Sequence, residues 1–329
     1  MDFLYLTLLF VFIAAAVFAG TGALLPFLRS RAILDHPNER SSHDTPTPKG
    51  GGIAVVATLL TGWAGIAVIT DPTQQSVFVV IIAAAALAAL SWADDLRGLS
   101  PLARLAGQFV AVAAVLMLAP SGGPYFQGLL PPALDSLAVA VLWVWFINVF
   151  NFMDGIDGIT CVEAICLGIG IALVAETGAI IGFYGLVVAA AAAGFVKWNW
   201  HPAKIFLGDV GSVPLGFVLG WLLLGLAANG QWAAALILPA YYLMDATVTL
   251  VRRALRGEKV WQAHKGHFYQ QAVHGGLSHA AMARSVLAMN SILIVLAILS
   301  TKGWQGPALI AAALLAAGFL RYLAKDRRS

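Results

Sequence analysis

Long apolar stretches follow one another along almost the whole chain, separated by short polar segments. Eleven of these stretches come near the roughly 20 residues that a helix needs to cross a bilayer. They are residues 3–27, 53–70, 76–92, 102–118, 136–152, 159–175, 179–196, 213–227, 232–251, 281–300 and 307–323. Charged residues make up only 11% of the chain, against about 25% in water-soluble domains. The sequence therefore predicts an all-α polytopic membrane protein with about eleven transmembrane helices, in which residues 1–329 form a single domain.

The basic residues provide a check on the number of spans. If the odd-numbered stretches all run inward, every one of the 19 Lys and Arg residues except Lys302 falls on the same side. The positive-inside rule then places the N-terminus outside and the C-terminus in the cytoplasm. Cytoplasmic loops are expected at about 28–52, 93–104, 153–158, 197–212 and 252–280. The first stretch is long enough to span and lacks a basic n-region, so no cleavable signal peptide is expected.

Acidic side chains stand directly at the ends of predicted spans, on the cytoplasmic side. Asp94 and Asp95 follow the third stretch, and Asp209 precedes the eighth in the motif FLGDVGS. A charge in such a position is costly unless it binds something. Carboxylates that converge from separate helices favour a hard cation such as Mg²⁺, which would hold a phosphate-bearing substrate. Arg104 and Gln108 lie one helical turn apart beyond the acidic pair, on one helix face. The alternative is a solvated helix end, in which Arg104 balances the pair.

A glycine-rich acidic motif, NVFNFMDGIDG, joins the fifth and sixth stretches. Its glycines allow tight backbone geometry near a ligand. Asp154 and Asp157 would share a face if the segment is helical, and Asn151 lies one turn before Asp154. The alternative is that these Asn and Asp side chains merely cap two helices.

Two further cytoplasmic segments are candidates for substrate contact. The segment NWHPAKIFLGDVGS begins with Asn199 and offers free N–H groups at the start of a helix, which suit an anion. Its Phe206 could stack on a base, although an aromatic residue at the membrane interface is equally typical. The run PTPKGGG contains Lys49 but lacks the GKS/T ending of a nucleotide P-loop. This run is either a substrate-facing loop or a turn before a membrane helix.

Histidines are concentrated in the last cytoplasmic loop. His264 and His267 flank Lys265 in AHKGHFYQ, and no cysteine or further ligand lies at a spacing that suits zinc. Anion binding or proton handling fits this pair better, with a plain solvated loop as the alternative. We expect His274 and His279 to be surface residues.

The Asp-Asp pair, NxxDGxDG and FxGDxGS, in this order and on this topology, resemble the polyprenyl-phosphate N-acetylhexosamine-1-phosphate transferases. Such enzymes start O-antigen, teichoic acid and enterobacterial common antigen chains and make the first lipid intermediate of peptidoglycan. The resemblance extends from the PTPKGGG loop to the last cytoplasmic loop. The AHKGHFYQ loop is most similar to the O-antigen-initiating branch that handles fucosamine- or quinovosamine-type sugars. Gly266 departs from this pattern, because many relatives have a histidine there.

The resemblance implies a role for each motif. Asp94 and Asp95 would engage the lipid phosphate and the metal, and Asp209 would bind Mg²⁺, for which Mn²⁺ can substitute. The loop residues His264 and His267 would lie near the nucleotide diphosphate and belong, with Asp94, Asp95 and Asp154, to the catalytic set. The residues implied in substrate binding are Asp157, Asn199 and Phe206 around the uracil base, with Asn151, Arg104, Gln108 and Lys49 completing the set.

The reaction implied by this resemblance is transfer of N-acetylhexosamine-1-phosphate from a UDP-sugar to polyprenyl phosphate, with release of UMP. It would take place at the cytoplasmic face of a bacterial inner membrane. Nucleic acid is not expected as a partner, and a homodimer is left open. The alternatives are a secondary transporter and a non-enzymatic scaffold for glycan assembly. Acids that gather at one membrane face, rather than at the midplane, argue against the transporter.

Overall fold

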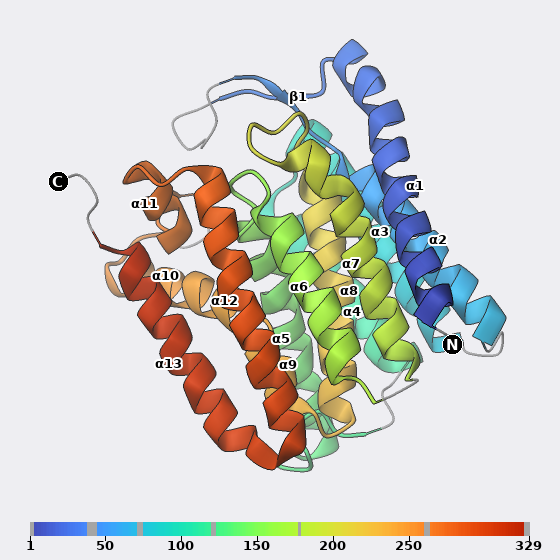
Figure 1. The fold of residues 1–329 in the computed structure, drawn as a ribbon, viewed down its shortest axis with the longest axis vertical. Helices are drawn as coiled ribbons and strands as arrows, with labels where there is room; N and C mark the ends of the chain where they lie inside the picture. The colour runs from blue at the N-terminus through green and yellow to red at the C-terminus, as the bar shows by residue number, and fades with distance from the viewer. Residues whose placement is uncertain are drawn as a thin grey trace.

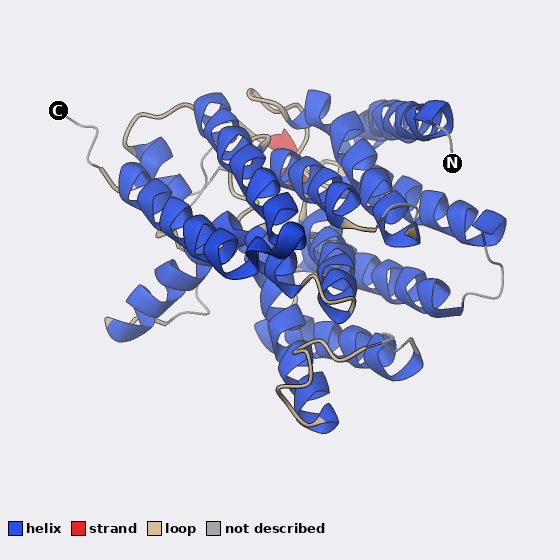
Figure 2. Ribbon diagram, turned by 60° about the horizontal axis from the view of Figure 1, so that its bottom comes forward, coloured by secondary structure: helices blue, strands red, loops and turns tan. Residues whose placement is uncertain are grey.

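The computed structural model describes residues 3–37, 45–70, 75–119, 123–176, 179–259 and 264–325. Within these residues the protein is a bundle of helices (Figures 1 and 2) with one short antiparallel strand pair. The strands are β1 (Leu34–Asp35) and β2 (Thr47–Pro48). The helices are α1 (Phe3–Ser30), α2 (Gly52–Thr70), α3 (Gln75–Arg97), α4 (Pro101–Leu118), α5 (Pro132–Phe152), α6 (Ile159–Val174), α7 (Ile180–Asn199), α8 (Asp209–Ala228), α9 (Trp232–Ile237), α10 (Ala240–Leu255), α11 (Phe268–His274), α12 (His279–Leu299) and α13 (Gln305–Leu323).

The predicted all-α polytopic membrane fold is confirmed. Among the described residues, eight helical runs are long and apolar enough to cross a membrane, and the longest covers 279–323. That run contains two passes, because Gly303 adopts a φ of 91° and turns the chain back so that α12 and α13 form a hairpin (Figure 1). The shorter α6 is apolar as well, and the number of eleven passes stays a prediction.

Helix α8 lies at the centre of the bundle, where 83% of the residues in its most apolar stretch are buried. Helix α1 lies at the edge, and only 22% of the corresponding residues are buried. Helices in lipid gain little from the hydrophobic effect between them, so close packing has to come from small residues. A Cβ added at Gly168 of α6 would lie 2.4 Å from the carbonyl oxygen of Gly185 in α7. On α8, a Cβ at Gly216 would lie 2.9 Å from Phe150 of α5. These glycines bring the central helices into direct contact and so fix the relative positions of their ends.

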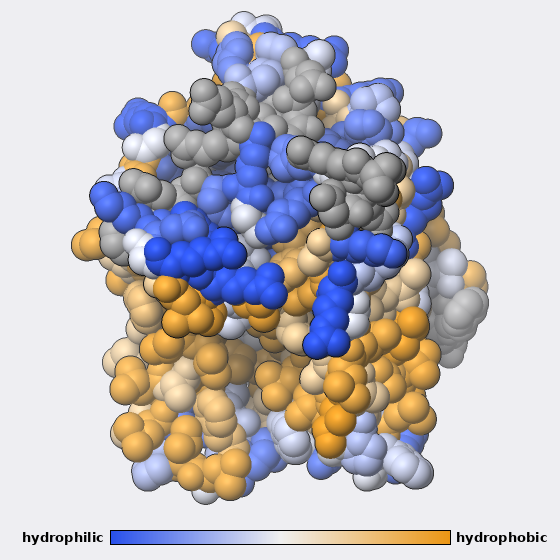
Figure 3. Space-filling view, turned by 90° about the vertical axis from the view of Figure 1, so that its left-hand side faces the viewer, coloured by the Kyte–Doolittle hydropathy of each residue, from blue (hydrophilic) through white to orange (hydrophobic). Residues whose placement is uncertain are grey.

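Polar residues gather at one end of the bundle. In Figure 3 hydrophilic residues cover the upper part of the molecule, above a broad hydrophobic band, and a thinner polar rim follows below. The upper end carries the strand pair and α11 (Figure 1), together with the turns that connect α3 to α4, α5 to α6 and α7 to α8. Each motif singled out in the sequence therefore lies at this end, while Lys302 lies in the turn at the other.

Candidate active site

Three aspartates from two helices meet at the polar end of the bundle. Asp94 and Asp95 lie in the last turn of α3, and Asp209 is the first residue of α8. The Nη1 atom of Arg104 lies 3.2 Å from Asp94 Oδ2 and 3.8 Å from Asp209 Oδ2, so one guanidinium bridges both carboxylates. The structure therefore brings together residues that are more than a hundred positions apart in sequence, as the motifs predicted.

Asp95 is held differently from its neighbour. Its Oδ2 accepts a hydrogen bond of 3.0 Å from the backbone N–H of Val210, and its Oδ1 lies 3.7 Å from Lys49 Nζ. A carboxylate at the first turn of a helix is favoured by the free N–H groups and by the helix dipole. Gly208, with a φ of 75°, leaves room for this contact, since a Cβ there would lie 2.9 Å from Asp95 Oδ2. Asp95 thus links α3 to the start of α8 and to the loop that carries Lys49.

The PTPKGGG loop runs alongside the segment that precedes α8. Lys49 and Phe206 form a parallel bridge, in which the Phe206 N–H donates to the Pro48 carbonyl at 2.8 Å. The N–H groups of Gly50 and Gly51 both donate to the Phe206 carbonyl, at 3.2 and 2.9 Å. The loop is therefore built into the site, which agrees with the substrate-facing alternative rather than with a turn that only precedes a membrane helix.

Two amide side chains of the substrate-binding set join α5 to its neighbours. Asn151 Nδ2 donates to Asp209 Oδ1 at 2.9 Å and to Ser212 Oγ at 2.8 Å. Gln108, which is buried, accepts a hydrogen bond of 2.6 Å from Asn148 Nδ2 and so connects α4 to α5. Asn151 borders the carboxylate cluster directly, whereas Gln108 fixes the helices that surround it.

Asp154 lies in the turn between α5 and α6, where it is half-buried. Burial raises the pKa of its carboxyl to about 7, and the nearby charges of Asp209 and Asp95 add to the effect. A carboxyl group that titrates near neutral pH beside a cluster of acids is typical of a functional site.

The loop histidines pack against the end of α5. The ring of His267 stacks on His264 at 4.8 Å, and its Nδ1 lies 3.3 Å from the buried carboxylate of Asp245 in α10. The same carboxylate accepts backbone N–H groups at the start of α11, and the Tyr269 hydroxyl donates to the Phe152 carbonyl at 3.1 Å. These contacts hold α11 and the histidine loop over the turn that carries Asp154.

The protonation of His264 follows from its surroundings. Burial lowers the pKa of this imidazole to about 4, and the neighbouring His267 and Arg253 lower it further. Its Nδ1 accepts the backbone N–H of Gly266 at 3.0 Å. His264 is therefore neutral at pH 7 and supplies no positive charge for anion binding.

Asp157 lies in a second cluster beside the first. Its Oδ2 is 2.6 Å from His201 Nδ1, 3.3 Å from His279 Nδ1 and 3.1 Å from the backbone N–H of Ala203. The expectation that His279 is a surface residue was wrong, because it is only 6% exposed and faces this carboxylate. His201 was not identified from the sequence at all, although it stands two positions after Asn199 in a motif already under consideration.

Asn199 is buried next to this cluster. Its Oδ1 accepts the backbone N–H of Gly158 at 3.0 Å, and its Nδ2 donates to the Ile205 carbonyl at 3.1 Å. The side chain therefore ties the end of α7 to the α5–α6 turn. A contact between Asn199 or Asp157 and a base stays a prediction.

The donor set around Asp94 and Asp209 fits a hard divalent cation. Mg²⁺ prefers carboxylate oxygens, and these two carboxylates share one guanidinium, with Asp95 next to Asp94 on α3. Arg104 already places a positive charge between Asp94 and Asp209. The residues present are therefore the ones that could hold such an ion, with phosphate oxygens completing its ligands.

The region that contains the carboxylate cluster matches a known family. Residues 77–227, from α3 to α8, fit the model of glycosyl transferase family 4. A protein of Streptomyces coelicolor named as a glycosyltransferase is 30% identical over 305 residues, covering 89% of this chain and 70% of that protein. The chain belongs to glycosyl transferase family 4. It is thus an enzyme of a family that the sequence motifs had already indicated.

Two further relatives carry more specific names. A Bacillus subtilis protein named as an undecaprenyl-phosphate N-acetylglucosaminyl 1-phosphate transferase is 28% identical over 281 residues, which are 80% of this chain and 76% of the relative. A decaprenyl-phosphate N-acetylglucosaminephosphotransferase of Mycobacterium tuberculosis is 27% identical over 305 residues, covering 81% and 75%. These names refer to N-acetylglucosamine and so do not support the fucosamine- or quinovosamine-type branch expected from the AHKGHFYQ loop. They give no support for a homodimer either.

Proposed function

We propose that this protein transfers N-acetylhexosamine-1-phosphate from a UDP-sugar to polyprenyl phosphate, forming a polyprenyl-diphosphate sugar and releasing UMP. The observation that carries the proposal is the meeting of Asp94, Asp95 and Asp209 with Arg104 and Lys49 at one end of a membrane bundle. A site of this composition can bind a cation and phosphates together. Its place at the end of the spans suits a reaction between a lipid-borne and a water-soluble substrate.

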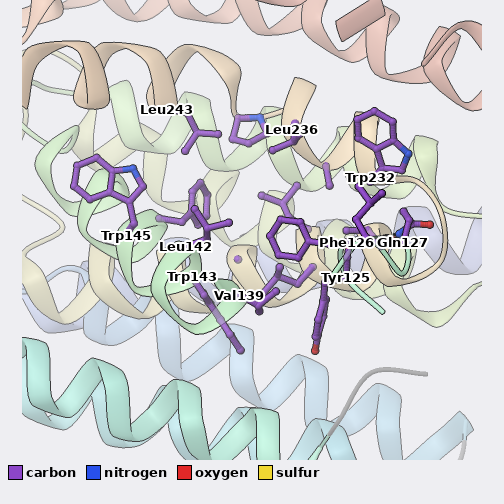
Figure 4. Close-up of a pocket in the computed structure, with 18 residues that line it drawn as sticks. Tyr125, Phe126, Gln127, Val139, Leu142, Trp143, Trp145, Trp232, Leu236 and Leu243 are labelled. Carbon is purple, nitrogen blue, oxygen red and sulfur yellow. Dashed lines mark hydrogen bonds between the residues drawn. The ribbon is translucent and has the colours of Figure 1, made fainter. Parts of the chain in front are cut away.

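An apolar cavity offers a place for the lipid tail of the acceptor. The cavity has a volume of about 400 Å³ and lies between α5, α8 and α9, with aromatic side chains that include Trp143 and Phe126 around it (Figure 4). Leu142 and Leu236 line it and are 50% and 48% exposed, so it opens toward the surrounding lipid. Its lining ends at Phe146, about 7.5 Å along α5 from Asn151. We propose that part of an isoprenoid chain lies in this cavity and that its phosphate reaches the carboxylate cluster at the polar end of the bundle.

The chemistry we propose is a direct displacement at phosphorus. An oxygen of the polyprenyl phosphate forms a bond to the β-phosphorus of the UDP-sugar, and the bond from that phosphorus to the bridging oxygen breaks. The bridging oxygen leaves with the electron pair as part of UMP. A phosphate monoester has its second pKa near 6, so the acceptor is largely dianionic at neutral pH and little proton removal is needed.

The side chains of the site have roles that follow from their contacts. Arg104 and Lys49 supply positive charge to the phosphate groups, which stabilises the negative charge that develops on the leaving group. Asp94 already has its Oδ2 on Arg104 and its Oδ1 on the backbone N–H of Leu99, so it orients the acceptor rather than acting as a strong base. Asp209, with Asp94 and Asp95, would hold Mg²⁺. When bound, this ion would screen the diphosphate and stabilise the departing UMP.

We propose that the UDP-sugar is recognised on the side of the carboxylate cluster that faces away from the apolar cavity. Phe206 and Asn199 belong to the segments next to this cluster, and His264 and His267 lie over the α5–α6 turn. The relatives' names make UDP-N-acetylglucosamine the first donor to test. We propose that the product starts a cell-surface glycan, of which an O-antigen is one kind.

Release of UMP from purified protein tests this function. The protein in detergent would be incubated with polyprenyl phosphate, Mg²⁺ or Mn²⁺ and a panel of UDP-N-acetylhexosamines that includes fucosamine- and quinovosamine-type donors. We expect UMP release that depends on both substrates. Failure with every donor would contradict the proposal, whereas lipid-independent uptake of the UDP-sugar into vesicles would favour the transporter.

The substitution Asp209→Asn tests the assignment of the metal site. We expect a loss of about 100-fold or more in turnover, because a charge that would balance the cation is removed. Glu176→Gln, at the other end of the bundle, is the matched control and should leave turnover unchanged. Substantial Mg²⁺-dependent activity in Asp209→Asn would show that the metal is placed wrongly. Isolation of a phosphosugar-aspartate adduct in the absence of lipid would overturn direct displacement.

The proposed orientation, with the active site facing the cytoplasm of a bacterial inner membrane, can be tested separately. Both native cysteines are buried, which leaves a low background for thiol labelling. In spheroplasts, an impermeant maleimide should label Lys302→Cys directly and should label Lys259→Cys only after permeabilisation. The reverse pattern would invert the proposed topology.

A further inference from the structure

Asp157, His201 and His279 form a compact group outside the cluster of Asp94, Asp95 and Asp209. One ligand atom from each lies within 4.8 Å of the others. We propose that these three side chains form a second metal site, which takes Zn²⁺ or another borderline transition-metal ion and is distinct from the magnesium site. The inference rests on the geometry of the group and not on the proposed transferase reaction.

The distances suit a tetrahedral ion. Zinc bonds of 2.0–2.2 Å to nitrogen and oxygen place neighbouring ligand atoms about 3.3 Å apart. His279 Nδ1 already lies 3.3 Å from Asp157 Oδ2. His201 Nδ1 lies 2.6 Å from the same oxygen and has to move outward by about 0.7 Å. This side chain is 42% exposed, so the movement meets little resistance.

The donor set selects the class of ion. Two imidazole nitrogens and one carboxylate oxygen are typical of zinc sites that keep a fourth position for water. Mg²⁺ prefers oxygen ligands and is disfavoured here. The Asp157 and His279 side chains are 7% and 8% exposed, while the exposed side of His201 leaves a way in for the ion and its water. The backbone N–H of Ala203 donates to the carboxylate and orients it, as groups around metal ligands commonly do.

The three ligands come from three separate segments. Asp157 lies in the α5–α6 turn, His201 in the segment between α7 and α8, and His279 is the first residue of α12. An ion at this point would therefore tie together three elements that border the candidate active site. We expect Zn²⁺ to stabilise the fold, because an ion that binds only the folded state shifts unfolding to higher temperature.

Metal binding can be measured directly. Protein purified with a chelator would be titrated with Co²⁺, a spectroscopic substitute for Zn²⁺, in excess Mg²⁺. We expect visible absorption bands of a tetrahedral Co²⁺ site that saturate at one ion per chain and disappear on addition of Zn²⁺. In the same buffer, Zn²⁺ should raise the unfolding temperature by several degrees.

Two variants locate the site. His201→Gln and His279→Gln should each lower the apparent affinity for Co²⁺ and Zn²⁺ at least tenfold, as measured from the Co²⁺ bands and the thermal shift. His274→Gln on α11 should behave as wild type. His201 is exposed, so its variant keeps the fold even if His279→Gln does not. Absence of a Co²⁺ spectrum in wild-type protein, or equal zinc responses in wild type and His201→Gln, would show that the group is a hydrogen-bonded cluster without a metal.

Discussion

Gly52, the first residue of α2, touches the start of α8, and its substitution tests how closely the site depends on helix packing. A Cβ at this position would lie 2.3 Å from the Cα and 2.4 Å from the N of Gly211, and 2.9 Å from the carbonyl oxygen of Leu207. Ordinary contacts of a Cβ lie at 3.4–4 Å. All three neighbours are backbone atoms, so no side-chain rotation relieves the overlap. In Gly52→Ala the two helices therefore have to separate by about 1 Å or more.

The separation has two measurable consequences. Overpacking of this kind costs about 1–3 kcal/mol of stability, which should lower the unfolding temperature by several degrees. Asp209 opens α8 two residues before Gly211, so its carboxylate is displaced relative to Asp94 when the helix moves. A displacement of about 1 Å in a catalytic arrangement can reduce the rate about 100-fold. We expect turnover to fall by this order, with a smaller change in the KM of the UDP-sugar.

The matched control lies on the same helix. Gly65 is exposed, and a Cβ there would meet nothing within 4 Å. Gly65→Ala should leave turnover unchanged and stability equal or slightly higher, since alanine is the better helix former by about 1 kcal/mol. Rates of UMP release and unfolding temperatures would be measured for both variants at a temperature where both are folded. Wild-type turnover in Gly52→Ala would refute the argument that this contact sets the position of Asp209.

The remaining predictions concern charge. Because burial raises the pKa of Asp154 to about 7 from 3.8, the folded protein without divalent cation retains a proton that the unfolded chain loses, and its stability should fall as pH rises through this window. Asp154→Asn should remove that fall in unfolding temperature, and an unchanged slope would contradict the assignment. His264 is neutral above about pH 5.5, since burial lowers its pKa to about 4, so His264→Gln should not alter the shape of the pH–rate profile between about pH 6 and 8. Asp94→Asn and Asp95→Asn should each lose about 1–3 kcal/mol of stability, because in each variant a basic side chain and a backbone N–H lose a charged partner, and Asp94→Asn should in addition abolish turnover. A wild-type unfolding temperature in either variant would contradict this argument.

The fold was largely predictable because lipid leaves few choices to a chain. The length of the apolar stretches predicted the spanning helices, including the two that form the hairpin at Gly303. The distribution of charge assigned the loops to one end, and the loops brought Asp94 and Asp209 together. Each of these inferences depends on a pattern along the sequence. In a membrane protein such a pattern directly determines where a residue lies along the membrane normal.

Contacts within the polar end were less predictable, because they depend on how loops cross one another. His279 follows a long polar loop and looks like a solvated residue in sequence, yet the pairing of α12 with α6 places it against Asp157. His201 lies beside a proline in the segment NWHPAKIFLGDVGS, in which other residues were the site candidates. Charge is the signal that would have identified both histidines. A buried Asp157 carboxylate needs hydrogen-bond partners, and these two side chains lie within reach of it.

The adjacent pair Asp94-Asp95 illustrates the same difference between sequence and space. Two neighbouring acids read alike in sequence, and both were assigned to the metal and the lipid phosphate. On a helix, however, consecutive side chains point about 100° apart. Asp94 faces Arg104 and Asp209, where a cation and phosphates would meet, and Asp95 faces the first turn of α8 and Lys49. The two neighbouring carboxylates therefore have different partners, and Asp95 in addition holds in place the start of the helix that supplies Asp209.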